Sequence, residues 1–509
     1  MKSLGVLSLL LLATLAGCLS SSNQTATAPG PTYPASGQRH ALPGDPMPEG
    51  AGHDHADPAQ HKFLWNYAFA GRDALLGNDV NTAGVHALDL QNGWLFGAVY
   101  GSHAASVDGG LVIWDVHTDP AHPKEVGRWT IPGSVGGDRS MEATPDGDYA
   151  VISTEDVDCL GHANPLGVVS AYLIDARDKT RPVVADVITA AGPSGGDLLG
   201  QGTGQGLGPS LGEHSVAVHR IHGADYAFVF GKIYKISRGE GAAGTKLQYV
   251  SQVNAQVEKH DIYVRDTPWN TTWALAADGR SNLMLVWDVT NPATPYEVGQ
   301  WDVPNKTALL KEQKVEYYIH TADVSFQDGH AVIVVTSEDF GPHVSPFWVL
   351  DGDPIRDVRV GQGPANLTVL GTWQNPGNHQ AHEDLSFSLH NPRLHDGGIL
   401  TLSSYHAGVW QLDLRGKEFW ANPAPIAYAV YAEGTAPKAQ DPVEAAVQGQ
   451  LCKLGTGVVA PEFMDVEVGR DGVLYLADVF MGLYTFTPTA DHPVYGSART
   501  TEYVGTSGQ

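Results

Sequence analysis

Histidine recurs at one position in a series of short, similar segments of this chain. The segments read VHALDL, EHSVAV, KHDIYV, IHTADV and AHEDLS, and a further one, FMDVEV, carries Met464 at the same position. Imidazole suits Zn, Cu and Fe as a ligand, and a thioether favours Cu(I). The aligned positions therefore form a candidate metal-ligand set, with Cu or Zn as the cofactor that it would suit. Its histidines are His86, His214, His260, His320 and His382.

Two interpretations of this histidine set stay open. Acidic neighbours such as Glu213, Asp261 and Glu383 would orient imidazole ligands and tune their basicity. Duplication of a structural unit also copies its polar residues, so the same pattern would arise if each His only bonded the adjacent unit and water. If the repeated units surround a wide central space, the histidines would also lie too far apart to share one ion. The sequence supports a metal site and a purely structural ring alike.

The segments that carry the histidines belong to an internal repeat. GGLVIWDVHTDPAHPKEVGRW (109–129) and SNLMLVWDVTNPATPYEVGQW (281–301) share an apolar strand, an Asp, a turn with two prolines and a second strand ending in Val-Gly-x-Trp. Each such unit must bury one face against its neighbours. From about residue 80 onward the chain is nearly all short strands and turns. The seven units open near His86, Arg139, His214, His260, His320, His382 and Met464.

The third strand of each unit has a recognisable core. The cores are LVIWD (111–115), AYLID (171–175), LVWD (285–288), FWVLD (347–351) and VWQLD (409–413), with KIYKIS and LYTFTP as degenerate forms. This repeat pattern resembles that of the LVIVD-repeat family of extracytoplasmic β-propellers over about residues 80–505. The resemblance implies an all-β fold, a seven-bladed β-propeller of four-stranded blades. That family is not tied to one activity, so the resemblance implies no catalytic residues.

A propeller would bring the histidines together at one end of its central channel. Its first strands are innermost, so equivalent positions form a ring at one channel mouth. The long segments 190–212 and 434–460 should open on the same face, where binding usually resides. The hairpins between second and third strands should also face that way. They carry His103, His162, His343, Tyr405 and His406.

Several repeat residues are expected to be structural. The Asp that ends each third-strand core should accept backbone N–H groups in an Asx turn. These residues are Asp115, Asp175, Asp288, Asp351 and Asp413. Trp129 and Trp301 should be buried between blades. Two segments are candidates for the strand that closes the ring, 63–70 and TTEYVG (500–505). The second fits the fourth-strand pattern, and 61–75 would then pad an edge.

The N-terminal residues predict export and a lipid anchor. Residues 4–15 form an apolar stretch too short to span a bilayer. It ends in Leu-Ala-Gly-Cys, which resembles the lipobox of prokaryotic lipoproteins. The resemblance implies a signal peptide over 1–17, lipid on Cys18 and attachment to a membrane at the cell surface or in the periplasm. Residues 18–60 are a Ser/Thr/Pro/Gly-rich linker, followed by a propeller over 61–509.

Two further features of the sequence leave alternatives open. The linker ends in HDHADPAQH (53–61), which could capture a transition metal or simply be a soluble spacer. Cys159 and Cys452 are an even pair in an oxidising compartment, but spacing alone does not show that they form a disulfide.

Charge and motif content narrow the function. A formal charge of −26 argues against a nucleic acid partner. There is no Walker sequence and no HExxH, and the Gly-rich run 190–212 does not join a strand to a helix. We therefore expect a scaffold lipoprotein that binds a small molecule or a protein through its His-rich channel-mouth face. The alternative is a metal-dependent oxidoreductase that uses the histidine ring.

Overall fold

The computed structural model describes most of the repeat region. The described residues are 62–75, 83–101, 108–131, 140–153, 169–189, 215–253, 260–278, 281–303, 318–338, 346–375, 389–395, 397–431, 462–469, 471–479 and 481–496. All of them belong to one compact unit, Ala41–Gln509. The predicted signal peptide, Cys18, the linker, Cys159 and Cys452 lie outside the described residues. Within the described ranges, no helix is both long and apolar enough to cross a membrane.

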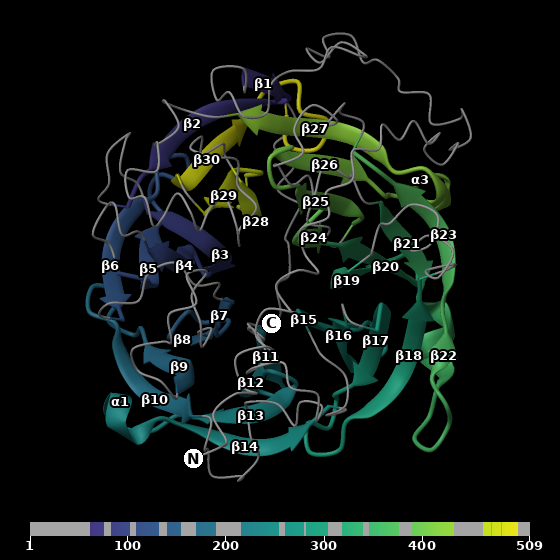
Figure 1. Cartoon of the computed structure of the whole chain (residues 1–509), viewed down its shortest axis with the longest axis horizontal. Helices are drawn as coiled ribbons and strands as arrows, with labels where there is room; N and C mark the ends of the chain where they lie inside the picture. The colour runs from purple at the N-terminus through teal and green to yellow at the C-terminus, as the bar shows by residue number, and fades with distance from the viewer. Residues whose placement is uncertain are drawn as a thin grey trace, which may run out of the picture. The chain divides into compact units, whose positions relative to one another are not determined.

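The fold is a seven-bladed β-propeller, as the repeat predicts. Seven antiparallel sheets stand around a common axis, with first strands at the centre and last strands at the rim (Figure 1). Blades one to three are β3 (Gly84–Gln91), β4 (Trp94–Gly101), β5 (Gly110–Asp115), β6 (Lys124–Thr130); β7 (Met141–Ala143), β8 (Tyr149–Ser153), β9 (Val169–Asp175), β10 (Val183–Thr189); and β11 (Val216–Ile221), β12 (Ala224–Val229), β13 (Lys232–Ser237), β14 (Lys246–Gln252).

The remaining four blades follow the same order. They are β15 (Ile262–Asp266), β16 (Thr272–Asp278), β17 (Leu283–Asp288), β18 (Tyr296–Asp302); β19 (Ile319–Gln327), β20 (His330–Ser337), β21 (Phe347–Asp351), β23 (Thr368–Trp373); β24 (Pro392–His395), β25 (Ile399–Ser403), β26 (Val409–Asp413), β27 (Ala424–Tyr431); and β28 (Phe463–Val468), β29 (Leu474–Asp478), β30 (Gly482–Pro488) with β2 (Tyr67–Asp73). All seven third-strand segments predicted from the sequence are third strands here.

The ring is closed by the N-terminal strand β2. It pairs with β30 in antiparallel register from Tyr67↔Pro488 to Asp73↔Leu483 and so becomes the outermost strand of blade seven. The preference for TTEYVG as this strand was therefore wrong, and that segment lies outside the described residues. Strand β1 (Lys62–Trp65) does pad an edge, because it pairs with β27 of blade six. The two N-terminal strands thus join neighbouring blades.

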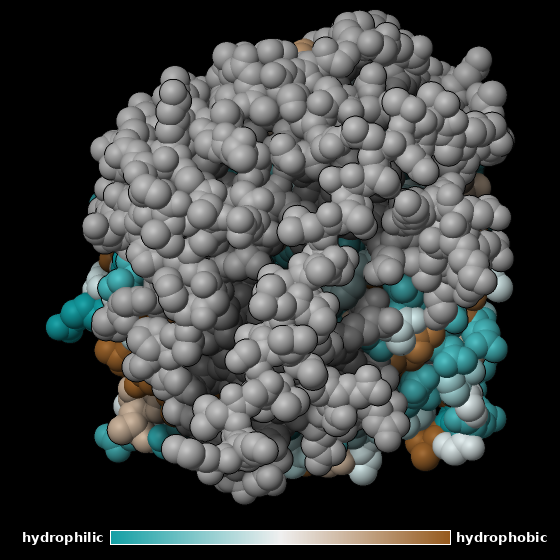
Figure 2. Space-filling view, in the orientation of Figure 1, coloured by the Kyte–Doolittle hydropathy of each residue, from teal (hydrophilic) through white to brown (hydrophobic). Residues whose placement is uncertain are grey.

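Several short elements lie outside the four-stranded blades. Strand β22 (Ala365–Asn366), from the connection between β21 and β23, pairs in parallel with β18 of blade four. The helical elements among the described residues are α1 (Gly241–Gly244), η2 (Asp353–Asp357) and α3 (Lys417–Ala421). Figure 2 shows that the coloured part of the rim is largely hydrophilic, with scattered hydrophobic residues. This surface suits a propeller whose apolar faces are turned toward neighbouring blades.

Each pair of neighbouring blades buries its own hydrophobic cluster, including the pair formed by blades seven and one. Trp301 is 4% exposed and lies in the cluster between blades four and five, as predicted. Trp129 packs against the cluster between blades one and two but is only partly buried. Burial of sheet faces all round the ring is what makes the blades depend on one another.

The Asp residues of the repeat are turn residues, as predicted. Asp115 accepts the backbone N–H of His117 at 2.8 Å, and Asp288 accepts that of Thr290 at 2.9 Å. Asp175, Asp351 and Asp413 do the same with the residue two positions on. The hydrogen bond from the backbone N–H of His117 lowers the pKa of Asp115. The carboxylates therefore maintain the fold.

Candidate metal centre

Three histidines lie at the start of three consecutive inner strands. His320 belongs to β19, whereas His260 and His390 lie two residues before β15 and β24. The backbone N–H of His260 donates to the carbonyl of Ala277, and that of His390 donates to the carbonyl of Ser403. These bonds extend each strand ladder by one step beyond the strand itself. The same end of the ring thus receives imidazoles from blades four, five and six.

The imidazoles meet around one carboxylate, that of Glu338, which follows the last residue of β20. Its Oε2 lies 3.6 Å from Nε2 of His260 and 3.7 Å from Nε2 of His320, and its Oε1 lies 3.9 Å from Nε2 of His390. The ring centroids of neighbouring histidines are 4.2 Å and 4.0 Å apart. We call His260, His320, His390 and Glu338 the His3Glu cluster.

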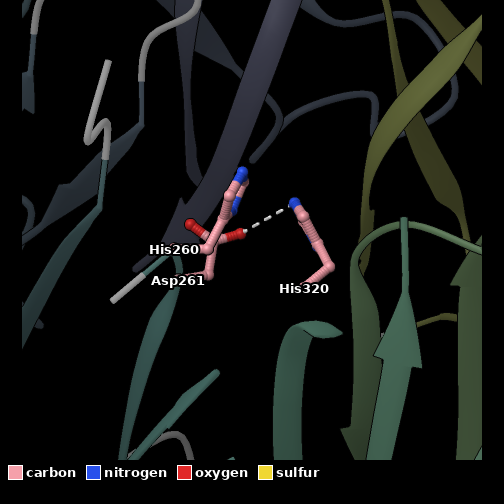
Figure 3. A group of neighbouring side chains, drawn as sticks. All are labelled: His260, Asp261 and His320. Carbon is pink, nitrogen blue, oxygen red and sulfur yellow. Dashed lines mark ion pairs between the residues drawn. The ribbon is translucent and has the colours of Figure 1, made fainter. Parts of the chain in front are cut away.

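Asp261 lies beside the His3Glu cluster. Figure 3 shows its carboxylate directed toward Nε2 of His320, and the two atoms are 3.6 Å apart. Asp261 also accepts a hydrogen bond from the hydroxyl of Thr321 at 3.1 Å. That hydroxyl in turn bonds Nδ1 of His320. A chain from Asp261 through Thr321 therefore orients the His320 ring.

Hydrogen bonds fix the direction of the imidazoles. Nδ1 of His390 lies 2.6 Å from the carbonyl oxygen of Met464, which can only accept, so Nδ1 carries the proton and the lone pair is on Nε2. The Thr321 hydroxyl bonds Nδ1 of His320 and lies 3.1 Å from the Asp261 carboxylate, which leaves Nε2 of His320 directed at Glu338. In His390 the atom directed at Glu338 is thus the one able to bind a metal, and in His320 the same atom, Nε2, faces Glu338. Such outer hydrogen bonds are typical of histidine ligands.

The cluster is well shielded from solvent. The side chains of His320, His390 and Glu338 are 0%, 2% and 6% exposed, and that of His260 is 10% exposed. Burial of an isolated charged carboxylate is costly unless hydrogen bonds or a cation compensate for it. A carboxylate among three imidazoles, two of them held by hydrogen bonds, is a chemically sensible cation site.

The distances fit a transition metal. Zinc bonds of roughly 2.0–2.1 Å place tetrahedral ligand atoms about 3.3 Å apart. The separations of 3.6–3.9 Å between the carboxylate oxygens and Nε2 atoms exceed this by a few tenths of an ångström. Two sets of three ligand atoms lie within 4.8 Å of one another, and they share His320: one is His320, Glu338 and His390, and the other is His260, Asp261 and His320. Three imidazoles and one carboxylate suit Zn, Cu or Fe rather than Ca or Mg.

The structure brings together only part of the predicted histidine ring. His260 and His320 are adjacent, and His86 is buried with its ring centroid 6.4 Å from that of His390. His214 and His382 lie outside the described residues. Met464 contacts the cluster through its backbone carbonyl. Tyr405 and His406 are buried, and His103, His162 and His343 fall outside the described residues.

Sequence reasoning missed two members of the cluster, His390 and Glu338. The sixth blade opens at β24 (Pro392–His395), so the position assigned to His382 in the repeat alignment belongs to His390. A signal was available, because His86 precedes the Asn92-Gly93 turn by six residues and His390 precedes Asp396-Gly397 by the same offset. Glu338 follows the second strand of blade five and opens EDFGPH (338–343), which resembles EDVDCLGH (155–162) after the second strand of blade two, so a signal was available for it as well.

A second polar layer fills the axis of the ring next to the cluster. Arg393, on β24 of blade six, bonds Asp465 and Glu467 of blade seven, the hydroxyl of Tyr263 in blade four and the carbonyl of Leu88 in blade one. It therefore reaches across the axis and ties four blades together. The central channel expected from the sequence is filled by side chains at this level.

Carboxylates of this layer link consecutive blades. Asp465 accepts the backbone N–H of Leu88, Asp89 accepts that of Ala143, Glu142 accepts that of Val218, and Asp323 accepts that of Leu394. Burial raises the pKa of Glu142 and that of Glu467 to about 8. Burial lowers the pKa of His395 to about 4. Glu142, Glu467 and His395 are therefore largely neutral at pH 7.

Comparison with known proteins adds the fold alone. No family model matches the chain, and no curated protein matches it. Similar solved structures include the WD40 β-propeller domain of Doa1, at 10% identity, covering 86% of this chain and 100% of that one with a TM-score of 0.44. The periplasmic gluconolactonase PpgL of Pseudomonas aeruginosa has 10% identity, coverages of 69% and 86%, and a TM-score of 0.44. A hypothetical selenium-binding protein from Sulfolobus tokodaii has 11% identity, coverages of 75% and 87%, and a TM-score of 0.42. Similarity at this level says nothing about activity.

Proposed function

We propose that this chain is a metal-binding β-propeller whose functional centre is the His3Glu cluster. The observation that carries the proposal is the position of Glu338, whose carboxylate lies within 3.9 Å of Nε2 of three histidines from three blades. A His ring that served only to bond adjacent blades would need no shared carboxylate. Here His390 bonds the next blade through Nδ1, but its Nε2 and those of His260 and His320 all lie close to the carboxylate of Glu338.

The proposal favours the metal alternative over the scaffold expected from the sequence. A binding scaffold needs no buried carboxylate among imidazoles, and it would retain exposed polar groups for its partner. The His3Glu side chains are at most 10% exposed. Outer hydrogen bonds from Met464 and Thr321 hold two of the rings in the orientation that metal binding requires.

The donor set narrows the choice of metal to Zn, Cu and Fe. Three neutral imidazoles and a carboxylate are acceptable to all three ions, and affinity alone follows the order Fe²⁺ < Cu²⁺ > Zn²⁺. The alternative function expected from the sequence is a Cu- or Zn-dependent oxidoreductase, and a form of it in which the metal itself changes oxidation state requires Cu or Fe, since Zn has no redox chemistry. Identification of the bound metal therefore separates a redox centre from a hydrolytic or structural one.

The test is the metal content of tag-free protein purified without chelators. We expect close to one equivalent of Zn, Cu or Fe per chain by elemental analysis. Chelation should lower the melting temperature, and restoring the metal should raise it again by mass action. Metal affinity should also fall as the pH drops below about 6, because protons compete for imidazole nitrogen.

Matched variants locate the site. His320→Ala and Glu338→Gln should abolish stoichiometric binding. His330→Ala should not, although His330 also lies beside a carboxylate, that of Asp353, at the opposite end of β20. Deletion of 53–61 controls for the HDHADPAQH tract and should leave one equivalent bound. Metal-free wild type that takes up no Zn, Cu or Fe would overturn the proposal and leave the scaffold function standing.

A further inference from the structure

Tyr405 occupies a backbone conformation that disfavours a tyrosine. It lies between β25 and β26, with a φ of 37°, in the left-handed region. Glycine adopts that region freely, whereas bulky residues pay a steric cost for it. Tyr405 is nevertheless 2% exposed, so the conformation is not relieved by freedom at the surface. Strain of this kind is commonly kept where a side chain is needed for function.

Three backbone contacts maintain this conformation. Ser404 donates its N–H to the carbonyl of Gly408 at 2.8 Å, which closes the turn. The carbonyl of Tyr405 accepts from Gly408 at 3.2 Å and from Phe463 of blade seven at 3.3 Å. The turn is thereby fixed to the next blade, and backbone hydrogen bonds alone are enough to define its geometry.

The side chain of Tyr405 reaches the His3Glu cluster. Its hydroxyl donates a hydrogen bond to Oε1 of Glu338, and its ring lies 5.0 Å from the ring of His390 at an interplanar angle of 32°. One oxygen of Glu338 is thus held toward Tyr405 and His390. The other, Oε2, is left facing His260 and His320. A single phenol accordingly fixes which way the carboxylate presents its two oxygens.

We infer that Tyr405 is a positioning residue of the metal centre, one that orients the Glu338 carboxylate and supports the His390 ring. The inference rests on the proposed metal-binding function. It assigns Tyr405 no direct bond to the ion. It explains why a tyrosine stands where the backbone favours glycine, since glycine would supply neither the hydroxyl nor the ring.

The experiment compares Tyr405→Phe and Tyr405→Gly with wild type in metal-free form, each titrated with Co(II) and Zn(II). Tyr405→Phe keeps the ring and the backbone but removes the hydroxyl, and we expect metal affinity to fall by about 10- to 100-fold. Its Co(II) visible spectrum should also differ from wild type, because the geometry of the carboxylate ligand changes. Tyr405→Gly relieves the backbone and should bind at least as weakly as Tyr405→Phe.

Tyr475→Phe is the matched control. Tyr475 is a buried tyrosine whose hydroxyl bonds the carbonyl of Pro120 at 3.0 Å, so the substitution also removes a buried phenol from a hydrogen bond. It should leave affinity and spectrum unchanged. Wild type that binds neither ion would overturn both the metal function and this role. Wild-type binding with unchanged affinity and Co(II) spectrum in both Tyr405 variants would overturn the positioning role alone.

Discussion

Asp465 of blade seven accepts a hydrogen bond of 2.9 Å from the backbone amide of Leu88 in blade one. The last blade and the first are therefore joined at the axis as well as at the rim. Arg393 bonds both the Asp465 carboxylate and the Leu88 carbonyl, so the joint is shared with blade six. A buried guanidinium at this junction is a sensitive point for stability.

Replacement of Arg393 by Leu should destabilise the protein by about 3–5 kcal/mol, because it leaves the buried carboxylate of Asp465 without its cation and removes the hydrogen bond that Glu467 accepts. Urea unfolding measures this change. Arg415→Leu is the control, since Arg415 is 47% exposed and paired with Asp413, and it should cost less than about 1 kcal/mol. Equal losses of unfolding free energy in the two variants would show that the buried bonds of Arg393 stabilise the protein no more than the exposed ion pair of Arg415 does.

Stability should decline as the pH rises through the neutral range. Burial raises the pKa of Glu142 and Glu467 from 4.5 to about 8 in the folded protein, so folding takes up protons between these values. The corresponding stability is fully present below pH 4.5 and is lost as the pH rises through about 8. The lowered pKa of His395 acts in the opposite direction below about pH 6.5, so the melting temperature of metal-free protein should fall between pH 7 and pH 8.5.

Glu142→Gln keeps an acceptor for the Val218 amide but cannot ionise, so its melting temperature should depend less on pH over this range. Glu418→Gln, at an exposed position, should follow wild type. A wild-type melting temperature that rose from pH 7 to pH 8.5 would contradict the raised pKa values.

Truncation should reveal which strand closes the ring. A chain that begins after Asp73 lacks β2 and leaves the edge of β30 without its partner, so we expect loss of the cooperative thermal transition and aggregation. A chain that ends before residue 500 should melt as wild type does, because β2 already supplies the fourth strand. Differential scanning calorimetry of both truncations shows which segment closes the ring. Loss of the transition only in the C-terminal truncation would restore TTEYVG as the closing strand.

The two repeat tryptophans should differ in importance. Trp301→Ala should cost about 3–5 kcal/mol, since Trp301 is buried between blades four and five. Trp129→Ala should cost less, because Trp129 is only partly buried. Chemical denaturation of the two variants side by side provides the measurement. A larger loss at Trp129 would conflict with the packing at the two blade interfaces.

Membrane attachment through Cys18 stays a prediction from the lipobox. Cys18→Ser should move the propeller from the membrane fraction to the soluble extracytoplasmic fraction without changing its melting temperature. Fractionation followed by immunoblotting checks the first part. Protein that remained bound to membranes after a salt wash would refute a lipid anchor at this residue.

The fold was predictable because its signals are local. The apolar core ending in Asp115 and the equivalent core ending in Asp288 each specify a third strand and the Asx turn after it within a few residues. The closing strand was not predictable in this way. Its pairing joins Tyr67 to Pro488, and nothing in either segment's own pattern specifies a partner so distant in sequence.

The candidate site was predictable only where it repeats. His260 and His320 stand at equivalent positions of two blades, so alignment found them. His390 was missed because the alignment gave its place to His382, eight residues earlier in the sequence. Glu338 and Tyr405 belong to single blades, and their role depends on proximity in space to residues of other blades. The Glu-Asp run after the second strand recurs at 155–156 and 338–339, but the repeat does not show which histidines of other blades lie beside Glu338.

Closure by β2 has a consequence for how the molecule comes into being. Strand β2 is synthesised among the first parts of the ring but cannot find β30 until the last blade exists. Contacts between residues so distant in sequence form slowly, since a very long loop must be closed first. Until the last blade has formed, β2 has no strand to pair with. We therefore expect the growing chain to acquire its final shape late and abruptly, with a chaperone-dependent stage before the two ends meet.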